Sequence, residues 1–311
     1  MSRWPLALVL ALLPACRNPV AGVGPPGEVT VIVPDAATGD VPPRTDDLML
    51  TIDGHARHLI VHLPGGDLGT ARPLVFNLHG SGGNAAGQQA YTGMDALADA
   101  QGFIVVYPDG AIDLGGGFAW NVPGQPLSGG GAVPPDAADD IAFFARAIAA
   151  LTERYAIDWR RIYATGFSGG GRMASQIGCG LSGAVAAVAP VAGLRFPEGC
   201  ADARAVPVVS FHGTADGTNP YDGGGPPYWT YSVPSAAAQW AAHDACPDPP
   251  EVTQPATGVE LSDYRSCAAG AEVALYTIAG AGHEWPGAAQ QTLTVDANSV
   301  MWAFFLAHPL P

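Results

Sequence analysis

At residues 161–178 the chain reads RIYATGFSGGGRMASQIG, an apolar run followed by a glycine-rich turn around Ser168 and then by a helical pattern. This order predicts a strand over Arg161–Thr165, a tight turn, and a helix over Gly169–Ile177. Small residues two positions before and after a serine allow a strained strand-to-helix turn to expose its hydroxyl. The pattern alone is weak in a chain with 41 glycines, so its place directly after a strand is what makes Ser168 a candidate nucleophile.

Other short apolar runs alternate with longer helical patterns along the chain. Runs that are apolar throughout are typical of parallel strands buried on both faces, so the predicted fold is α/β, with a mostly parallel central sheet and helices on both faces. Asp53-Gly54, between two strand-like stretches in Leu48–Pro64, predicts an opening hairpin. Strands are expected at Leu74–Leu78, Phe103–Tyr107, Arg161–Thr165, Ala184–Ala189, Val206–Phe211 and Val273–Ile278, and helices at Gln88–Ala100, Asp139–Tyr155, Gly169–Ile177, Ser235–Asp244 and Ala297–Ala307.

A serine hydroxyl is a poor nucleophile near neutral pH, and it needs a general base that is oriented by an acid. After Ser168 in chain order, His283 follows a predicted strand in the loop GAGHEWPG, which suits a residue presented above the sheet. Asp216 lies between them, at the carboxyl end of another predicted strand. The weaker alternatives, which lie in a helical pattern, near the chain end or in an irregular stretch, are His243, His308 and Asp222.

Attack by a serine on an acyl group creates an oxyanion, which needs backbone N–H donors. Gly169, directly after the candidate nucleophile, is expected to supply one donor. The loop LHGSGGN at residues 78–84 follows a predicted strand, and we expect the second donor there from Ser81, with Gly82 as the alternative. The tryptophans that fall in irregular stretches beside these motifs are expected to line a substrate pocket, and they are Trp120, Trp229 and Trp285.

Seven motifs occur in one order along the chain: LHGSGGN, YPDG, AWN, DDIAFF, GFSGGGRMA, HGTADGTNPYDGG and GAGHEWPG. Over roughly Leu48–Ala307 this set resembles the secreted polyhydroxybutyrate depolymerase-like and feruloyl esterase-like hydrolases of the α/β-hydrolase superfamily. The resemblance implies the α/β-hydrolase fold, a triad of Ser168, Asp216 and His283, and esters of hydroxyalkanoic or hydroxycinnamic acids as substrates. Gly169 departs from the family pattern, because relatives often carry a bulkier residue there. Asp139 and Asp140 in the fourth motif are interpreted as structural, since carboxylates at a helix start cap it.

We therefore expect a serine esterase that acts on a small or oligomeric ester through an acyl-enzyme. Ser168 attacks, the alcohol leaves, and water activated by His283 completes hydrolysis. Two alternatives stay open: acyl transfer by the same site to a sugar or lipid acceptor, and a non-catalytic, surface-tethered binding protein on the same fold. An added acceptor that changes the product would identify the first, and the absence of covalent labelling by a fluorophosphonate would identify the second.

The composition excludes several classes of function. Charged residues make up 13% of the chain and the formal net charge is −15, so the chain lacks the basic surface that nucleic acids require. All thirteen basic residues are arginines, which excludes chemistry that depends on a lysine. No cofactor and no metal are expected. The histidines grouped on the first hairpin, explained as ordinary strand residues, are His55, His58 and His62.

The N-terminus is typical of an export signal, with Arg3 before a short apolar run from Pro5 to Pro14. Leu13-Pro14-Ala15-Cys16 also resembles a bacterial lipobox, which makes Cys16 a candidate for lipidation and a membrane tether. Simple cleavage and a retained anchor are the alternatives. The expected parts are a signal peptide at 1–16, a flexible linker at 17–45 and one catalytic domain at 46–311. The protein is therefore expected to be secreted or lipid-anchored outside the cytoplasm, in a bacterial cell envelope.

The remaining four cysteines are an even number in a chain with an expected export signal, which favours two disulfides. Three pairings are open. We favour Cys179 with Cys200 and Cys246 with Cys267, because each closes a short segment between expected core elements, and the family resemblance makes the same pairing plausible. A four-cysteine zinc site is the alternative, although no CxxC spacing is present.

Overall fold

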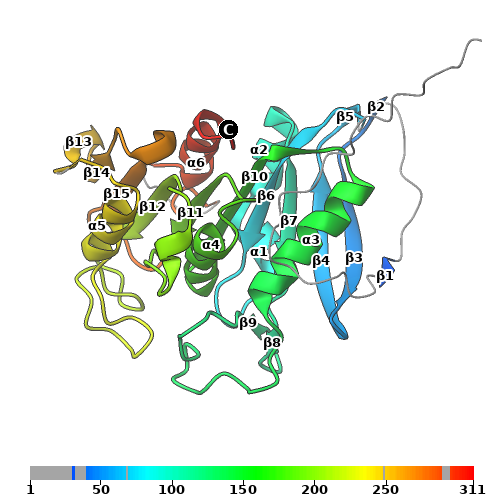
Figure 1. The fold of residues 1–311 in the computed structure, drawn as a ribbon, viewed down its shortest axis with the longest axis horizontal. Helices are drawn as coiled ribbons and strands as arrows, with labels where there is room; N and C mark the ends of the chain where they lie inside the picture. The colour runs from blue at the N-terminus through cyan, green and yellow to red at the C-terminus, as the bar shows by residue number, and fades with distance from the viewer. Residues whose placement is uncertain (1–29, 32–39, 68, 248, 289–294) are drawn as a thin grey trace, which may run out of the picture.

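The computed structural model of the protein describes residues 30–31, 40–67, 69–247, 249–288 and 295–311. The expected export signal, Cys16 and most of the expected linker lie outside this part of the chain. Within it, eleven strands form one sheet (Figure 1). In spatial order they are β1 (Thr30–Val31), β3 (Arg44–Ile52), β4 (His55–Leu63), β7 (Ile104–Pro108), β6 (Arg72–Leu78), β10 (Ile157–Phe167), β11 (Ala187–Val191), β12 (Val208–Gly213), β15 (Val273–Ile278), β14 (Val259–Tyr264) and β13 (Glu251–Ala256).

The centre of the sheet is parallel and its two margins are antiparallel. Strands β7, β6, β10, β11, β12 and β15 run in one direction. At one margin β4 runs against β7 and β3 against β4, and at the other β14 runs against β15 and β13 against β14. Two short ribbons stand apart, β2 (Asp40–Val41) with β5 (Gly66–Asp67), and β8 (Ile112–Asp113) with β9 (Phe118–Ala119). This order is that of an α/β-hydrolase fold, as the sequence predicted.

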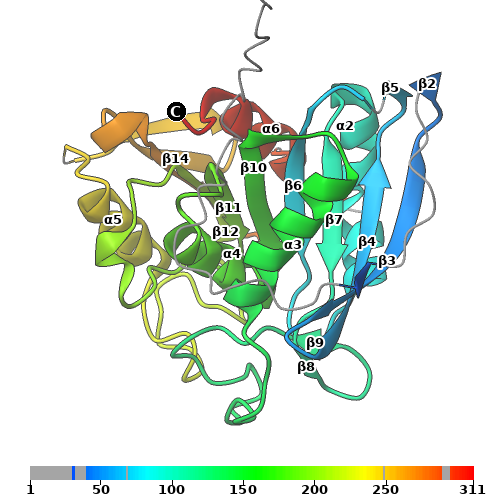
Figure 2. The same cartoon turned by 45° about the vertical axis from the view of Figure 1, so that its right-hand side comes forward.

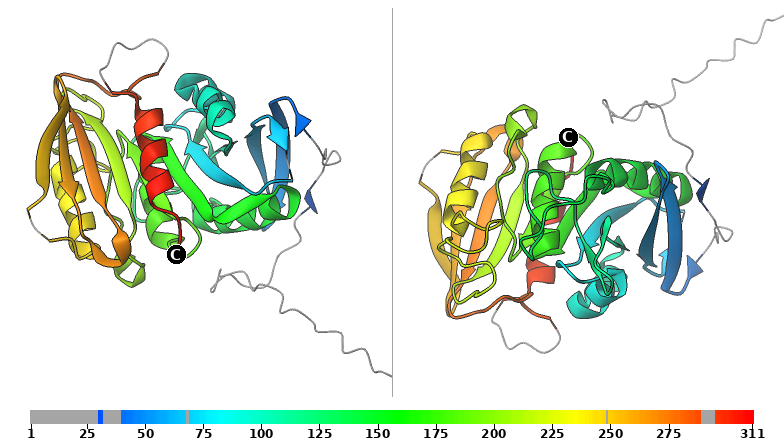
Figure 3. Two further views of the ribbon diagram at one scale, coloured as in Figure 1. Left: turned by 90° about the horizontal axis from the view of Figure 1, so that it is seen from above. Right: turned by 90° about the horizontal axis from the view of Figure 1, so that it is seen from below.

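Helices cover both faces of the sheet (Figure 3). On one face lie α1 (Ala85–Thr92), α2 (Met94–Gln101) and α6 (Ala297–Ala307), and on the other lie α3 (Asp140–Arg154), α4 (Gly169–Gly180) and α5 (Val233–His243). Each face has its own apolar core, because alternate strand residues such as Phe76 and Val75 point to opposite sides. Helix α3 packs across the sheet from β10 to β3 (Figure 2). The two short 3₁₀ turns in this part of the chain are η1 (Cys200–Asp202) and η2 (Ala268–Gly270).

The predicted hairpin forms, and its turn follows from two residues. Asp53 and Gly54 have φ angles of 51° and 82°, the left-handed pair that a two-residue turn between twisted strands needs. Strand β3 begins at Arg44, two residues before the expected domain boundary, and residues 30–31 pair with it. The sheet therefore takes in residues of the segment that the composition assigned to a linker.

Two parts of the fold differ from the sequence prediction. The helix expected over Gln88–Ala100 is two helices, because Gly93 adopts φ 58° and ends α1 before α2 begins. The hairpin of β13 and β14 was not predicted. Five of the six β13 residues are exposed and one of them is Pro255, so the strand lacks the apolar alternation that identifies a half-buried strand.

The structure contains the two sequence-local disulfides, Cys179–Cys200 and Cys246–Cys267. The first joins the end of α4 to η1, and the second joins the segment after α5 to the residue before η2. Each bridge closes a loop of 21 residues in sequence separation, so each limits the unfolded chain by a similar amount.

Adjacent aspartates at the start of α3 have different roles. Asp139 is the N-cap, and its side chain accepts hydrogen bonds from the amides of Ile141 and Ala142. Asp140 is fully buried, pairs with the buried Arg57 at 2.5 Å, and accepts a hydrogen bond from the Asn121 amide. The capping role assigned to both residues therefore holds for Asp139 only, whereas Asp140 joins α3 to the first hairpin.

This difference predicts unequal losses of stability in two neighbouring alanine variants. Asp140→Ala leaves the Arg57 charge buried without its partner, so we expect the free energy of unfolding to fall by about 3–5 kcal/mol. Asp139→Ala removes only an exposed cap and is expected to cost about 1 kcal/mol. Urea unfolding followed by circular dichroism measures both, and equal losses would contradict the assignment.

Candidate active site

Ser168 lies at a sharp turn between β10 and α4. Its backbone has φ 55° and ψ −113°, a conformation that residues with a side chain rarely adopt. Hydrogen bonds fix the turn on both sides: the Ser168 amide donates to the Val191 carbonyl at 2.9 Å, and its carbonyl accepts from the Arg172 amide at 3.0 Å. The surrounding structure therefore holds the strained turn that the sequence predicted, with the serine only partly buried.

The glycines of this motif are required by the close approach of β6. A Cβ atom on Gly170 would lie 2.3 Å from the Leu78 carbonyl oxygen, and one on Gly166 would lie 2.7 Å from the Leu78 Cβ. Neither contact is possible for a larger residue without moving the strand. The small residues thus let the turn sit directly against the end of β6, where the loop of residues 78–84 begins.

Asp216 and His283 are joined by a hydrogen bond of 2.7 Å between Oδ2 and Nδ1. Asp216 follows β12 and His283 follows β15, which are parallel neighbours, so their loops meet at one edge of the sheet. The other Asp216 oxygen accepts from the backbone amides of Thr218 and Asn219, each at 2.8 Å. The carboxylate is thereby fixed by its own loop while it holds the imidazole.

The charge state of Asp216 sets the tautomer of His283. Burial alone would raise the pKa of Asp216, but hydrogen bonds from His212, His283 and the Asn219 amide outweigh it and hold the pKa below its usual range. An ionised carboxylate only accepts hydrogen bonds, so His283 carries a proton on Nδ1. Its Nε2 is then left as the acceptor, which is the atom a general base needs.

Phe167 connects this pair to the serine turn. The ring of Phe167, directly before Ser168, lies 4.7 Å from the His283 ring. The Tyr91 ring also packs against Phe167, with centroids 5.4 Å apart, and its hydroxyl accepts a hydrogen bond from the Trp285 amide. Tyr91 therefore connects Phe167 to the loop that carries His283. The His283 side chain remains 18% exposed, which leaves it open to a ligand.

The loop after β6 is held against Ser168 by a buried histidine. A Cβ on Gly80 would lie 3.5 Å from the Ser168 Cβ. The His79 ring accepts a hydrogen bond from the Gly110 amide at Nε2 and donates from Nδ1 to the Gly80 carbonyl. Because burial lowers the pKa of His79, its ring stays neutral, as this pattern of one donor and one acceptor requires.

The same loop favours Ser81 over Gly82 as an oxyanion donor. The Gly82 amide already donates to the Phe118 carbonyl at 2.8 Å. Ser81, by contrast, lies directly against Gly169, since a Cβ on Gly169 would be 3.0 Å from the Ser81 backbone nitrogen and 2.3 Å from its Oγ. The structure thus gives a reason for the glycine at position 169, because the Ser81 side chain fills the space that a larger residue would occupy.

The three tryptophans expected as pocket walls are buried, and each donates a hydrogen bond from its ring nitrogen. Trp120 is 4% exposed, and its ring nitrogen donates to the His79 carbonyl. Trp229 is fully buried, stacks against His212 and donates to Pro220, behind the Asp216 loop. Trp285 is fully buried and donates to Asn298 in the core. Each ring nitrogen thus has an internal partner, and the role of these tryptophans as pocket walls stays a prediction.

The alternative acid lies at the surface, and the alternative bases have other hydrogen-bond partners. Asp222 is exposed, whereas Asp216 contacts His283. His243 lies against Asp244 and the Cys200 carbonyl, and His308 against the Phe304 carbonyl. On the first hairpin, His58 bridges Asp47 and Asp109, while His62 contacts Asp99. Among the described residues, no group of three or more histidines, cysteines and acids is arranged to hold a metal.

Sequence reasoning missed a polar chain behind Ser81. The Ser128 hydroxyl lies 2.7 Å from the Ser81 hydroxyl, and the guanidinium of Arg172 donates to Ser128 at 2.7 Å. Arg172 is 3% exposed and lies over the Tyr228 ring at 4.3 Å. An arginine among apolar residues one turn after Ser168 was a signal in the sequence, but its partners come from loops that only the fold brings together.

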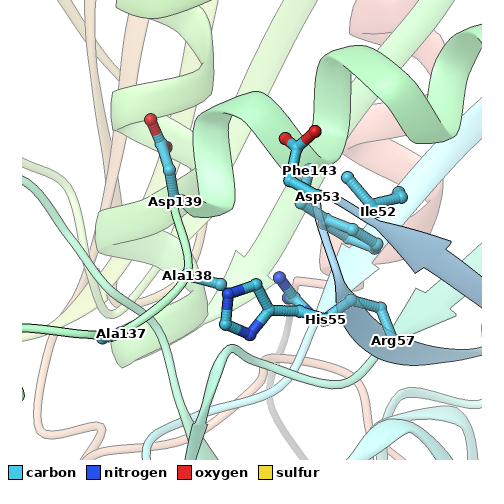
Figure 4. A pocket seen from close by; sticks show the side chains of 8 residues that line it. All are labelled: Ile52, Asp53, His55, Arg57, Ala137, Ala138, Asp139 and Phe143. Atoms are coloured by element: carbon cyan, nitrogen blue, oxygen red, sulfur yellow. The ribbon is translucent and has the colours of Figure 1, made fainter. Parts of the chain in front are cut away.

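A separate pocket with room for about 250 Å³ lies at the tip of the first hairpin (Figure 4). It is bounded by His55, Arg57 and Asp139, between the hairpin and the start of α3. None of the triad candidates lines it.

In the part of the chain that the structure covers, no helix combines the length and apolar character needed to cross a membrane.

The contact between Gly169 and Ser81 predicts coupled effects of two substitutions. Gly169→Ala introduces a Cβ against the Ser81 hydroxyl, and we expect a loss of about 1–3 kcal/mol in the free energy of unfolding. In the background of Ser81→Gly the same change should cost much less. A double-mutant cycle by denaturant unfolding measures the coupling, and strictly additive losses would show that the two residues do not press on each other.

The low pKa of Asp216 predicts a pH dependence of stability. A carboxyl group with a folded pKa below the ordinary value of 3.8 contributes stability above that value and loses it as the pH falls. Asp216→Asn cannot titrate. The difference in unfolding free energy between wild type and Asp216→Asn should therefore shrink below about pH 4, and a difference that stays constant from pH 6 to pH 3 would contradict the assignment.

Comparison with known proteins finds esterases that are similar to this chain. Feruloyl esterase B of Piromyces equi is 35% identical over 239 residues, which cover 73% of this chain and 42% of that protein, so the chain spans less than half of its length. The putative esterase NocK of Nocardia uniformis subsp. tsuyamanensis is 31% identical, covering 76% of this chain and 73% of the relative. The solved structure of an acetyl xylan esterase from Aspergillus awamori has a TM-score of 0.58 at 16% identity, covering 90% of this chain and all of that chain, a likeness of fold.

The family model described as esterase PHB depolymerase matches residues 58–222, more than half of the chain. The matched region includes the loop after β6, the turn at Ser168 and Asp216. The family assumed from the order of the seven motifs is thereby confirmed. The chain belongs to the PHB depolymerase family of esterases.

Proposed function

We propose that the protein hydrolyses carboxylic esters through an acyl-enzyme, with Ser168, His283 and Asp216 as the catalytic triad. The observation that carries this proposal is the 2.7 Å hydrogen bond between Asp216 and His283 at the same sheet edge as the strained turn at Ser168. The relatives, described as feruloyl esterases and an acetylxylan esterase/xylanase, support the reaction class.

In the first half of the reaction, the neutral Nε2 of His283 takes the Ser168 proton while the serine oxygen attacks the ester carbonyl. The carboxylate of Asp216 stabilises the imidazolium that forms. The backbone amides of Ser81 and Gly169 hold the oxyanion, and His283 then protonates the departing alcohol. Water activated by His283 releases the acid in the second half and restores the hydroxyl.

We infer that the substrates are esters of hydroxyalkanoic or hydroxycinnamic acids, as the family model and the feruloyl esterase relatives suggest. A panel of p-nitrophenyl butyrate, methyl ferulate, acetylated xylan and hydroxybutyrate oligomers separates these classes. Acyl transfer to a sugar or lipid acceptor remains the second candidate on the same triad, and a product that changes when acceptor is added would reveal it.

We also infer that the enzyme acts outside the cytoplasm as one catalytic domain, preceded by an export signal and a linker. The two disulfides support this location, because such bonds persist in oxidising compartments. The domain begins earlier than the expected residue 46, because β3 starts at Arg44 and pairs with residues 30–31. Mass spectrometry of the mature protein from its bacterial host would show whether Cys16 carries acyl chains.

Replacement of the nucleophile should abolish turnover. We expect Ser168→Ala to lower kcat/KM for p-nitrophenyl butyrate by about 10⁴-fold or more, because only oxyanion and binding effects remain. The same variant should lose covalent labelling by a fluorophosphonate. A folded variant that keeps more than a tenth of wild-type activity would remove Ser168 from the mechanism, and an unlabelled wild type would favour a binding protein.

The two candidate acids give a matched pair of variants. Asp216→Asn should lower kcat by several orders of magnitude, about 10⁴-fold in a comparable triad, because the amide favours the wrong imidazole tautomer. Asp222→Asn changes an exposed residue of the same loop and should leave kcat within about twofold. The reverse outcome would transfer the role to Asp222.

A further inference from the structure

Two arginines are buried at helix α4, which begins directly after Ser168. Arg172 lies one helical turn after the serine. Arg195 follows β11, two residues after Gly193, where an added Cβ would lie 2.3 Å from the Ser168 carbonyl oxygen. Each arginine is only 3% exposed. Arg172 contacts Ser128, in the long loop between β9 and α3, and Tyr228, in the long loop between β12 and α5. Both loops are drawn at the bottom of Figure 1.

Neither guanidinium has a carboxylate partner within ion-pair distance among the described residues. Arg172 donates to the Ser128 hydroxyl, and Arg195 has only long contacts, 3.5 Å to the Pro123 carbonyl and 3.4 Å to Gln176. The Nε atoms of both arginines are buried without a hydrogen-bond partner, and so is the hydroxyl of Tyr231. Three polar groups without a hydrogen-bond partner therefore share a region in which no described carboxylate lies within ion-pair distance of either arginine.

Other buried arginines show what a structural role looks like in this protein. Arg204 donates to four backbone carbonyls at 2.5 to 2.8 Å. Arg57 also has buried nitrogens without a hydrogen-bond partner, but its charge is paired with Asp140, which is what Arg172 and Arg195 lack. One nitrogen of Arg172 donates to Ser128, which in turn contacts the Ser81 hydroxyl, so this nitrogen has a structural role. Arg195 takes no part in that chain of contacts. Burying a charged group without a counter-ion is costly, so the pair requires another explanation.

Charge interactions agree with this geometry. Burial, together with a smaller effect of the Arg195 charge, lowers the pKa of Arg172 to about 10, although Tyr231 and Tyr228 act in the opposite direction. Burial likewise lowers the pKa of Arg195, which the Tyr231 hydroxyl and the more distant Glu198 oppose. Both groups stay charged at neutral pH, so an anion that entered would relieve the repulsion between them.

We propose that Arg172, Arg195 and Tyr231 form a subsite that binds a free carboxylate of the substrate, so that the enzyme prefers esters that carry one. Guanidinium groups bind carboxylates through paired hydrogen bonds, and Tyr231 adds a donor. The inference rests on the proposed ester hydrolysis and narrows its substrate class. Linear hydroxyalkanoate oligomers end in a carboxylate, whereas methyl ferulate has none. A dedicated cationic site is also needed because the net charge of −15 repels anions.

The first test uses wild-type enzyme and two substrates that differ only in charge. These are the linear dimer of 3-hydroxybutyric acid with a free carboxylate, and the same dimer capped as a primary amide. We expect kcat/KM at pH 7 to be about tenfold to a hundredfold higher for the acid, as for other hydrogen bonds to charged groups. A ratio near one would overturn the proposal without any variant.

Three variants then locate the preference. Arg195→Gln should bring the ratio of kcat/KM, acid over amide, close to one, and Arg172→Gln should do the same. Tyr231→Phe removes one hydroxyl and should lower the ratio by about threefold, which keeps the test valid if an arginine variant fails to fold. The matched control is Arg265→Gln, which removes the same charge from an exposed residue after β14 and should leave the ratio unchanged. A ratio unaffected in Arg195→Gln and Tyr231→Phe would refute the subsite.

Binding separates this inference from the proposed reaction. Calorimetry with Ser168→Ala should show tighter binding of the acid than of the amide, by the same factor of about ten or more. Equal binding would overturn the subsite even if esters are hydrolysed. Preferential binding together with no turnover of any ester by wild type would support the subsite and contradict the proposed function.

Discussion

The close contact between the turn at Ser168 and the end of β6 is the constraint on which the site depends. Gly170 lies so near the Leu78 carbonyl that no side chain fits between them. This contact brings the loop after β6 against the serine, which sets Ser81 beside Gly169. A helix that begins with three glycines has little helical propensity of its own, so α4 depends on being buried against the sheet. The turn at Ser168, the loop after β6 and the start of α4 are therefore one packing unit.

The sequence was sufficient for the central features of fold and site because each depends on local pattern or chain order. Val273–Ile278 and Ala297–Ala307 begin and end where their apolar patterns do. Asp216 could be preferred to Asp222 because it ends a predicted strand, and the structure places it against His283. These inferences needed no knowledge of which loops meet in space.

The remainder depends on contacts between distant segments. The sequence indicated that the three tryptophans lie in irregular stretches beside the motifs. It could not predict the hydrogen bonds of their ring nitrogens, because the backbone and side-chain partners are not apparent from any local pattern. Asp140 has the sequence position of a cap, and only the fold shows that Arg57, 83 residues away, is its partner. The surroundings of Arg172 are of the same kind, because Ser128 and Tyr228 come from two different loops.

Both disulfides lie at the edge of the sheet opposite Ser168, Asp216 and His283. Cys179 is near the far end of α4, whose first turn follows Ser168, and Cys267 precedes β15, whose other end leads to His283. The covalent cross-links thus fasten the base of the domain and leave the loops around the mouth of the site unlinked. Substitutions in those loops can therefore change the surroundings of Ser168 without altering the two bonds that hold the base of the domain.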